Sequence, residues 1–416
     1  MPRMRGKDRL MARDQAGGSA DAGGSCHGPT RRRVLAFGAG AALAPLLRDS
    51  AIAQPGADLG ALEGAVDRLV REIGVKPADP GLAVMLLKPG RVLLQKGYGI
   101  ADLRTGAPIT PFTRFEIASV SKTFTATAVL MLHERGLLSI DDDVRRYLPE
   151  LPQYAKQAVR LVDMLQHVSG LPSYFSLRDV PMRNKTYWVS EDYPAEFGRQ
   201  RRQFPLRFPV GATFEYNNTN FMLMAVVIAR VSGKPFADFM HDEIFAPARM
   251  TDSFIYDSPD SVPEATGRPC NNALGYELAR KRWEERWGTA PARHEQHLEV
   301  GDGAVWSNLA DMANWDNAIR TNLLLKPETM KLALRPSKTR DGELNGYGLG
   351  WFLYIDTRGK LIAFGHRGRW NGFETNYHND VRNDHTVVLL SNRGTSLDLD
   401  VLRQKLDATI LTYARG

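Results

Sequence analysis

Strand-like segments lie at both ends of this chain, and a long, largely helical stretch separates them. Near the beginning, residues 81–87 and 92–98 are apolar runs joined by the turn Lys88-Pro-Gly-Arg91, which predicts a β-hairpin. Strands from both ends can join one antiparallel sheet. The later strand-like runs are residues 348–355, 361–365, 373–378 and 385–391.

Two terminal helices are expected to cover one face of this sheet. Residues 58–73 carry apolar residues at helical spacing, and residues 397–413 form an amphipathic run. Residues from about 140 to 335 mix short helical patterns with loops. The expected fold is therefore mixed α/β, an antiparallel sheet flanked by helices plus an inserted, largely helical subdomain, with the active cleft where these two parts meet.

The first 53 residues differ in composition from the rest of the chain. Arginines follow Thr30, an apolar run ends near Leu47, and Ala51-Ile-Ala53 has the small-x-small pattern of a cleavage site. This arrangement predicts a twin-arginine-type export signal, a mature domain over residues 54–416, and a periplasmic or secreted location. A basic tail is the alternative interpretation. The apolar run of the leader is too short to span a bilayer comfortably, and no stable membrane span is expected in the mature chain.

The charge and the cysteine content of the chain bear on two questions, nucleic-acid binding and disulfide formation. The whole chain has a formal charge of +7, but residues 54–416 keep 45 basic and 43 acidic residues once the leader's 9 and 4 are removed. That near balance gives no argument for nucleic-acid binding. Cys26 lies in the leader and Cys270 is then alone, which excludes an intrachain disulfide in the mature domain.

The segment Phe115-Glu-Ile-Ala-Ser-Val-Ser-Lys-Thr-Phe124 holds the first catalytic candidates. Ser119 is the one serine of the chain with a lysine, Lys122, three residues later. On a helix these positions share a face, so the lysine amine can reach the serine hydroxyl and act as its base. The alternative is an exposed serine cap followed by a solvated lysine, so this pair needs further partners.

A second motif, Tyr216-Asn-Asn218, lies on a loop before a helical run. A tyrosine near a lysine can have a lowered pKa and pass protons, and an asparagine can hold a lysine or a substrate amide. A buried turn tyrosine is the alternative. The same pattern recurs at Tyr377-His-Asn379, which we interpret as sheet structure.

The third motif is His366-Arg367-Gly368, near the end of a predicted strand. If this strand lines the cleft, the N–H groups of Arg369 and Ser119 can together face a developing oxyanion. A glycine-rich turn between strands is the alternative.

The three motifs occur in the order and spacing of serine β-lactamases and penicillin-binding proteins, and the chain resembles the class C-like branch with its D-alanyl-D-alanine carboxypeptidases and carboxylesterases. The resemblance implies that Ser119 is the acylated nucleophile, that Lys122 and Tyr216 share acid/base work, and that Asn218 positions lysine and substrate. It implies the same mixed α/β fold. Further matches are Leu165-Gln-His-Val-Ser-Gly-Leu-Pro172, Pro209-Val-Gly-Ala-Thr-Phe214, Gly301-Asp-Gly-Ala-Val-Trp-Ser307 and Tyr347-Gly-Leu-Gly-Trp351.

This chain departs from the family pattern at the third motif. The usual lysine is His366, which is mostly neutral at pH 7, and the usual hydroxyl residue is Arg367. Arg367 can bind a substrate carboxylate through its fork, or it can point to the far face of the strand, because neighbours alternate. Efficient β-lactam hydrolysis is therefore not implied.

Other site types find little support in the sequence. His294-Glu-Gln-His297 lacks the order of a zinc motif, and no Gly-x-Ser-x-Gly elbow or phosphate-binding glycine loop occurs. We therefore expect no metal and no organic cofactor. Residues 173–208 have no clear period and are interpreted as a functional loop.

The sequence thus predicts an exported serine hydrolase that cleaves an ester or amide in a small molecule or peptide through an acyl-enzyme, as D-Ala-D-Ala peptidases and β-lactamases do. A carboxylesterase is the alternative reaction, and a catalytically inactive ligand-binding protein is the alternative of another class.

Overall fold

The computed structural model describes residues 58–154, 158–177, 187–258, 261, 272–287 and 297–413. They belong to one compact unit, residues 54–416. The predicted export signal, both cysteines and His294 lie outside the described residues. None of the described helices combines the length and the apolar character that crossing a membrane requires.

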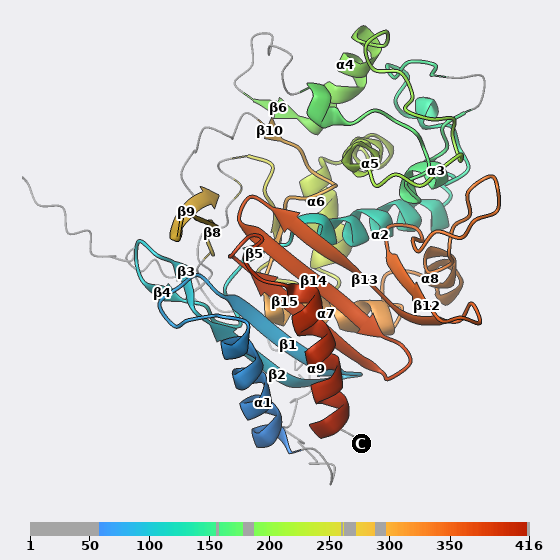
Figure 1. Ribbon diagram of the computed structural model, residues 1–416. Helices are drawn as coiled ribbons and strands as arrows, with labels where there is room; N and C mark the ends of the chain where they lie inside the picture. The colour runs from blue at the N-terminus through green and yellow to red at the C-terminus, as the bar shows by residue number, and fades with distance from the viewer. Residues whose placement is uncertain are drawn as a thin grey trace, which may run out of the picture. The chain divides into compact units, whose positions relative to one another are not determined.

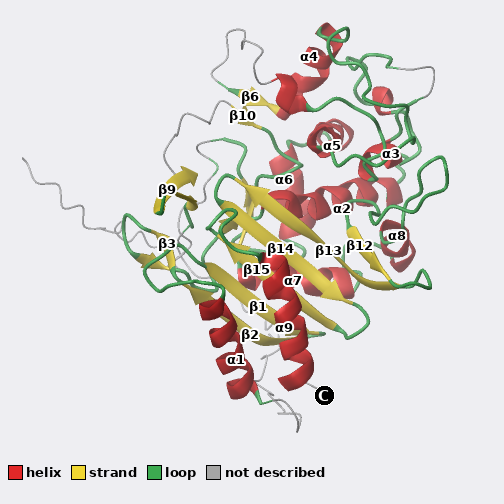
Figure 2. Cartoon of the chain, in the orientation of Figure 1, coloured by secondary structure: helices red, strands yellow, loops and turns green. Residues whose placement is uncertain are grey.

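A six-stranded antiparallel sheet forms the centre of the described structure (Figures 1 and 2). Strand β1 pairs with β15, with Leu82 opposite Ser391, so the N-terminal hairpin and the C-terminal strands share one sheet, as predicted. Across the sheet, the strands are β12 (Phe352–Ile355), β13 (Leu361–Trp370), β14 (Phe373–Asp380), β15 (His385–Ser391), β1 (Leu82–Lys88) and β2 (Arg91–Tyr98).

Helices cover both faces of this sheet. The side chains of Leu82, Val84 and Leu86 pack with the terminal helices α1 (Leu59–Glu72) and α9 (Leu399–Tyr413). Their neighbours Ala83 and Met85 face the main core, to which α7 (Leu309–Arg320) belongs. Because both faces are buried, β1 is apolar throughout rather than alternating. The prediction that the two terminal helices share one face is confirmed.

Helix α2 (Ser121–Glu134) runs through the main core and packs against α5 (Asn218–Ser232). It is buried on nearly all sides, as its apolar sequence requires, and Phe124 stacks on Trp315 of α7. Threonine hydroxyls of this helix find hydrogen-bond acceptors inside the core; that of Thr127, for example, donates to a backbone carbonyl one turn earlier. The helix is therefore a rigid support for residues at its N-terminal end.

Short elements complete the fold. The middle of the chain contributes α3 (Leu161–Leu165), α4 (Tyr193–Arg199), α6 (Phe236–Met240) and α8 (Pro327–Ala333). Three small strands, β5 (Phe115–Glu116), β11 (Val305–Ser307) and β7 (Phe254–Ile255), form a second sheet. Two-stranded pairs are β3 (Ile100–Asp102) with β4 (Ala107–Pro108), β6 (Trp188–Val189) with β10 (His297–Leu298), and β8 (Gly275–Ala279) with β9 (Arg282–Trp287).

Two strand boundaries differ from the expectation. Residues 348–351 form a turn before β12, because Gly350 has a φ of +85°, which is incompatible with a strand. Strand β13 continues to Trp370, five residues beyond the predicted end, through Gly368. That extension brings Gly368 of the third motif against Ile117 and Ala118, next to Ser119.

Candidate active site

Ser119 lies in a single 3₁₀ turn, Ala118–Val120, that leads directly into α2. The Nζ atom of Lys122 is 2.9 Å from the Oγ atom of Ser119 and donates a second hydrogen bond, of 2.6 Å, to the backbone carbonyl of Asp302. Lys122 is fully buried, and burial lowers its pKa to about 8. A lysine in this state can give up its proton near neutral pH and accept one from the serine.

Glu116 fixes the backbone next to Ser119, a role that the sequence analysis did not assign. Its Oε1 atom accepts the N–H groups of Ala118 and Ala304, both at 3.0 Å. Ala118 has a φ of +50°, an unusual conformation for a residue with a side chain. Burial raises the pKa of Glu116 to about 8. The carboxyl therefore holds a strained turn immediately before Ser119.

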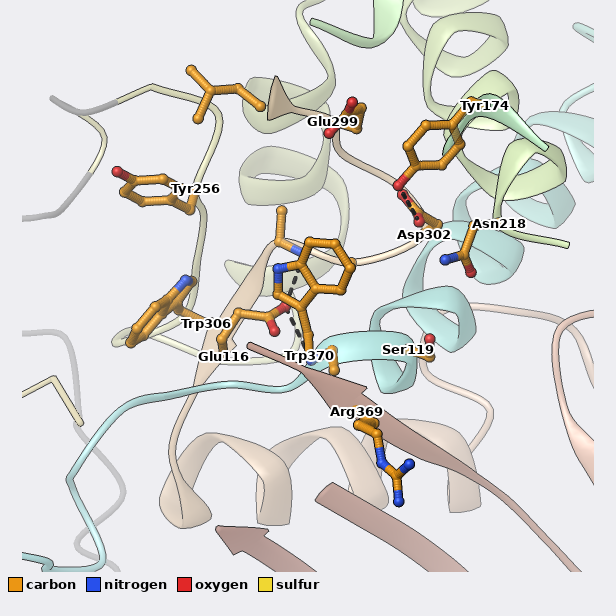
Figure 3. A pocket seen from close by; sticks show the side chains of 14 residues that line it. Glu116, Ser119, Tyr174, Asn218, Tyr256, Glu299, Asp302, Trp306, Arg369 and Trp370 are labelled. Carbon is orange, nitrogen blue, oxygen red and sulfur yellow. Dashed lines mark hydrogen bonds between the residues drawn. The ribbon is translucent and has the colours of Figure 1, made fainter. Parts of the chain in front are cut away.

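Asp302 is a second buried acid of the site. It lies in the family motif that begins Gly301-Asp-Gly-Ala, but the sequence analysis assigned it no role. Its carboxylate accepts a 3.0 Å hydrogen bond from the hydroxyl of Tyr174 (Figure 3). Burial raises the pKa of Asp302 to about 6, while the charge of Lys122 opposes this shift and that of Glu299 adds to it. Two buried carboxyl groups, those of Glu116 and Asp302, thus lie close to the buried amine of Lys122.

Tyr216 lies beside the lysine, with Nζ of Lys122 at 5.1 Å from its ring centroid, and its hydroxyl interacts with Ser119. The ring also packs on the buried His167, at 4.4 Å between centroids. Burial raises the pKa of Tyr216 above its usual value, and the interaction with Ser119 opposes this only in part. The expected lowering of its pKa is therefore wrong, and Tyr216 is a neutral phenol that can relay a proton.

Asn218 begins α5, and its side chain lines the same pocket (Figure 3). Its Oδ1 atom is buried and accepts no hydrogen bond from the described residues. The bonds of Lys122 go to Ser119 and Asp302. The predicted contact between Asn218 and Lys122 is therefore not formed, and Asn218 keeps an unused hydrogen-bond acceptor beside the pocket.

The third motif lies on β13, and its residues alternate between two faces of the sheet. His366 points inward: its Nδ1 donates to the backbone carbonyl of Arg367 at 2.7 Å, and its Nε2 accepts from the hydroxyl of Tyr347 at 2.9 Å. Burial lowers the pKa of His366 to about 3, so this ring is neutral. It adds no charge where family relatives are expected to have a lysine.

Arg367 points to the opposite face, where its guanidinium pairs with Asp400 of α9. The interpretation that Arg367 binds a substrate is therefore wrong, because β13 turns its side chain away from the pocket. Arg369 is among the residues that line the pocket, but the end of its side chain points away from it (Figure 3). A Cβ atom on Gly368 would lie 2.4 Å from the carbonyl oxygen of Ile117, so β13 lies directly on the turn that holds Ser119.

The pocket that contains Ser119 has an acidic and aromatic lining (Figure 3). Its acids are Glu116, Glu299 and Asp302, and its aromatic residues are Tyr174, Tyr256, Trp306 and Trp370. Among the residues that the structure describes, no group of histidine, cysteine, aspartate and glutamate side chains could hold a metal ion. The side chain of His297, like the whole of His294, lies outside this description.

A serine hydrogen-bonded to a buried lysine, on a mixed α/β fold that brings Asn218 and β13 to the same site, is typical of one class of serine hydrolases. The family model described as Beta-lactamase matches residues 66–411, and the chain belongs to this family.

The comparisons with individual proteins agree with this assignment. The chain is 28% identical to penicillin-binding protein 4* of Bacillus subtilis (strain 168), over 74% of this chain and 67% of that protein. The penicillin-binding protein homologue from Pyrococcus abyssi, an octamer, is similar in structure with a TM-score of 0.68 at 23% identity, over 86% of this chain and 78% of that one. The D-amino acid amidase from Ochrobactrum anthropi SV3 has a TM-score of 0.65 at 23% identity, over 85% of this chain and 100% of that one.

Proposed function

We propose that this protein hydrolyses an amide or ester bond through an acyl-enzyme on Ser119. The observation that carries the proposal is the 2.9 Å contact between the Ser119 hydroxyl and a buried lysine whose pKa is lowered to about 8. Ser119 Oγ attacks the carbonyl carbon of the substrate, and its proton passes to the neutral amine of Lys122. The carbonyl π electrons move onto oxygen and form an oxyanion.

Two backbone N–H groups are suited to hold that oxyanion, those of Ser119 and Arg369. The close approach of Gly368 to Ile117 supports the joint use of these two N–H groups, because it holds β13 against the turn that contains Ser119. The intermediate then collapses, the bond to the leaving group breaks, and the leaving group takes the proton from Lys122, directly or through Tyr216. Water repeats the sequence on the acyl-enzyme and releases the acid.

The geometry favours an amide or ester without a carboxylate that must be bound. His366 is neutral and Arg367 is turned away, so neither supplies a charge for the carboxylate of a β-lactam or of a terminal D-alanine. Two structural neighbours described as a D-amino acid amidase and a D-stereospecific amidohydrolase support amide cleavage. D-Ala-D-Ala peptidase activity, β-lactam reaction and carboxylesterase activity remain the competing outcomes of the test.

The test uses the full chain and its Ser119→Ala variant. We expect turnover of p-nitrophenyl esters or p-nitroanilides by the native protein, little covalent labelling by a fluorescent penicillin, and loss of turnover in the variant. Strong penicillin labelling would favour a D-Ala-D-Ala peptidase or a β-lactam-reactive protein. Binding without any turnover would favour an inactive ligand-binding protein, and full activity of the alanine variant would overturn the mechanism.

We also propose export of the protein by the twin-arginine route, on the strength of the leader sequence. Replacing Arg31 and Arg32 by lysine should keep the protein in the cytoplasm, and sequencing of the exported native protein should give Gln54 as its first residue. Export of the lysine variant at the native level would contradict this assignment.

A further inference from the structure

We propose that His167 is a positioning residue, which holds Tyr216 where its hydroxyl can relay a proton at Ser119. The inference rests on the acyl-enzyme function proposed above and adds a residue on which that reaction depends. His167 lies just after α3, in the motif Leu165-Gln-His-Val-Ser-Gly-Leu-Pro172, and its side chain is fully buried. Its backbone carbonyl, one ring nitrogen and the ring itself all contact Tyr216 or a direct neighbour of Tyr216.

Two hydrogen bonds fix the main chain on both sides of Tyr216. The backbone carbonyl of His167 accepts a 2.9 Å hydrogen bond from the N–H of Glu215. The Nδ1 atom of its ring accepts a 3.1 Å hydrogen bond from the N–H of Asn217. Tyr216 therefore lies between two main-chain groups that one histidine holds, and its backbone has little freedom to rotate.

The rings of His167 and Tyr216 are also in contact. Their centroids are 4.4 Å apart, and their planes are inclined by 41°. Tyr216 lies on the loop before α5, so regular secondary structure does not fix its side chain. Its phenol is nevertheless the group that must stay beside Lys122 and Ser119. The imidazole supplies a rigid support for that phenol, as the neighbours of a preorganised site do.

The protonation state of His167 suits this role. Because Nδ1 accepts the N–H of Asn217, the proton of the neutral ring is on Nε2. The side-chain amide nitrogen of Asn220 lies 3.1 Å from the same Nδ1. Burial lowers the pKa of His167 well below its usual value, and the charge of Lys122 lowers it further. The ring therefore stays a neutral acceptor at the pH where Lys122 loses its proton.

Two features of His167 are unfavourable for stability. Its φ is +58°, an uncommon conformation for a residue with a side chain. Its Nε2 atom is buried and has no hydrogen-bond partner among the described residues, and an unsatisfied buried donor is costly. Strained residues of this kind cluster at sites where function requires a fixed geometry. Positioning of Tyr216 gives such a requirement, whereas a role in stability alone does not.

Two substitutions separate the ring of His167 from its acceptor atom. His167→Phe keeps an aromatic ring but removes the acceptor for Asn217, and His167→Asn keeps an oxygen near the position of Nδ1 but removes the ring. We expect each to lower kcat for a p-nitrophenyl ester by about 10-fold or more, because a misplaced catalytic group slows the chemical step. KM should change less. Expressing kcat per folded molecule, from circular dichroism, excludes losses that come from unfolding.

A double-mutant cycle tests whether His167 acts through Tyr216. In Tyr216→Phe, which lacks the hydroxyl, His167→Phe should lower kcat further by about twofold at most. Losses that multiply in the double variant, or a loss of stability without a loss of kcat, overturn the inference. Ser119-dependent turnover would still leave the proposed function intact in that case.

His385→Asn is the matched control for the removal of a buried imidazole. His385 is fully buried at the start of β15, and its Nε2 lies 2.9 Å from a carboxylate oxygen of Asp407 on α9. The substitution therefore disturbs the contact between sheet and helix rather than the site of Ser119. It should leave kcat per folded molecule unchanged, even where it lowers the melting temperature.

A structural measurement needs no turnover. The protein is labelled with 3-fluorotyrosine, and the fluorine NMR signal of Tyr216 is identified by its absence from Tyr216→Phe. We expect one sharp signal in the native protein and in His385→Asn, but a broadened or divided signal in both His167 variants. That result supports the inference even if no substrate is hydrolysed. A single signal of native width in both His167 variants overturns it.

Discussion

The amine of Lys122 donates a 2.6 Å hydrogen bond to the backbone carbonyl of Asp302, 180 positions later in the chain. This bond ties the first turn of α2 to the segment before β11 and directs the amine at Ser119. A lysine held by a neutral acceptor gains less compensation for its buried charge than one in an ion pair with a carboxylate. Burial lowers the pKa of Lys122, and the charges of Asp302 and Glu116 oppose this shift only in part.

The first prediction concerns pH. Burial lowers the pKa of Lys122 to about 8, and only the neutral amine can accept the serine proton. Activity should therefore rise as pH increases toward about 8 and level off above it. The measurement is kcat/KM for a p-nitrophenyl ester between pH 5 and 10, corrected for spontaneous hydrolysis. A profile that is flat or falls across this range would contradict the assignment of Lys122 as base.

The matched variant for this prediction is Lys122→Arg. A guanidinium keeps the charge but does not lose its proton in this pH range, so it cannot act as the base. We expect kcat/KM to fall by about 100-fold or more, the usual contribution of general-base catalysis. Circular dichroism checks that the variant is folded.

The second prediction concerns the stability contributed by Glu116. Burial raises its pKa to about 8 in the folded protein, so between its usual value and pH 8 the folded state binds more protons than the unfolded state. Stability from this group therefore falls as pH rises through that window. Glu116→Gln keeps an oxygen acceptor for Ala118 and Ala304 but cannot ionise. The free energy of unfolding of this variant, compared with that of the native protein, should therefore be more favourable to the variant at pH 8 than at pH 5. Urea unfolding at both pH values measures the difference.

Glu116→Ala is the companion change. It removes the acceptor of a buried N–H group, that of Ala118, and of a partly buried one, that of Ala304, and an unsatisfied buried group costs about 1–3 kcal/mol. We expect this variant to be less stable than Glu116→Gln at pH 5. If the two variants were equally stable there, the hydrogen bonds to Glu116 would not hold this turn.

The third prediction compares neighbours on β13 that face opposite ways. Arg367→Gln removes a surface ion pair with Asp400, which is worth about 0–1 kcal/mol, and should change kcat/KM little. His366→Ala removes a buried ring that bonds Tyr347 and should lower both stability and activity. Steady-state kinetics and thermal melts of both variants test this. A larger activity loss in the arginine variant would mean that the arginine does reach the substrate.

The fourth prediction concerns Gly350, whose backbone lies against α2. A Cβ atom there would be 2.4 Å from that of Ala126 and 3.2 Å from the carbonyl oxygen of Lys122. Gly342 has a similar φ, +89° against +85°, and no atom within 4 Å of the same position. Gly350→Ala should therefore be less stable than Gly342→Ala by about 1–3 kcal/mol, the cost of overpacking, as measured in urea. Equal stability would show that only the φ angle matters.

Local patterns in the sequence predicted the parts of the fold that depend on local geometry. The hairpin of β1 and β2, the terminal helices and the spacing of Ser119 and Lys122 follow from side-chain periodicity within a few residues. The single shared sheet followed from having strands at both ends.

Properties set by distant contacts could not be read from the sequence. Whether Arg367 faces the pocket depends on the register of β13, in which His366 is paired with Tyr377, and one residue of slip would reverse it. The direction of the pKa shift of Tyr216 depends on burial by the whole fold. The acidic part of the pocket lining joins Glu116 to Glu299 and Asp302, which lie far from Glu116 in the sequence.

The most direct test of the central claim is to trap the acyl-enzyme. The native protein is mixed with a slow ester substrate and quenched in acid, and its peptides are mapped by mass spectrometry. The account predicts one acyl group on the peptide that contains Ser119, at the Ser119 oxygen, and none in Ser119→Ala. An acyl group on another residue, or native turnover by the alanine variant, would contradict it.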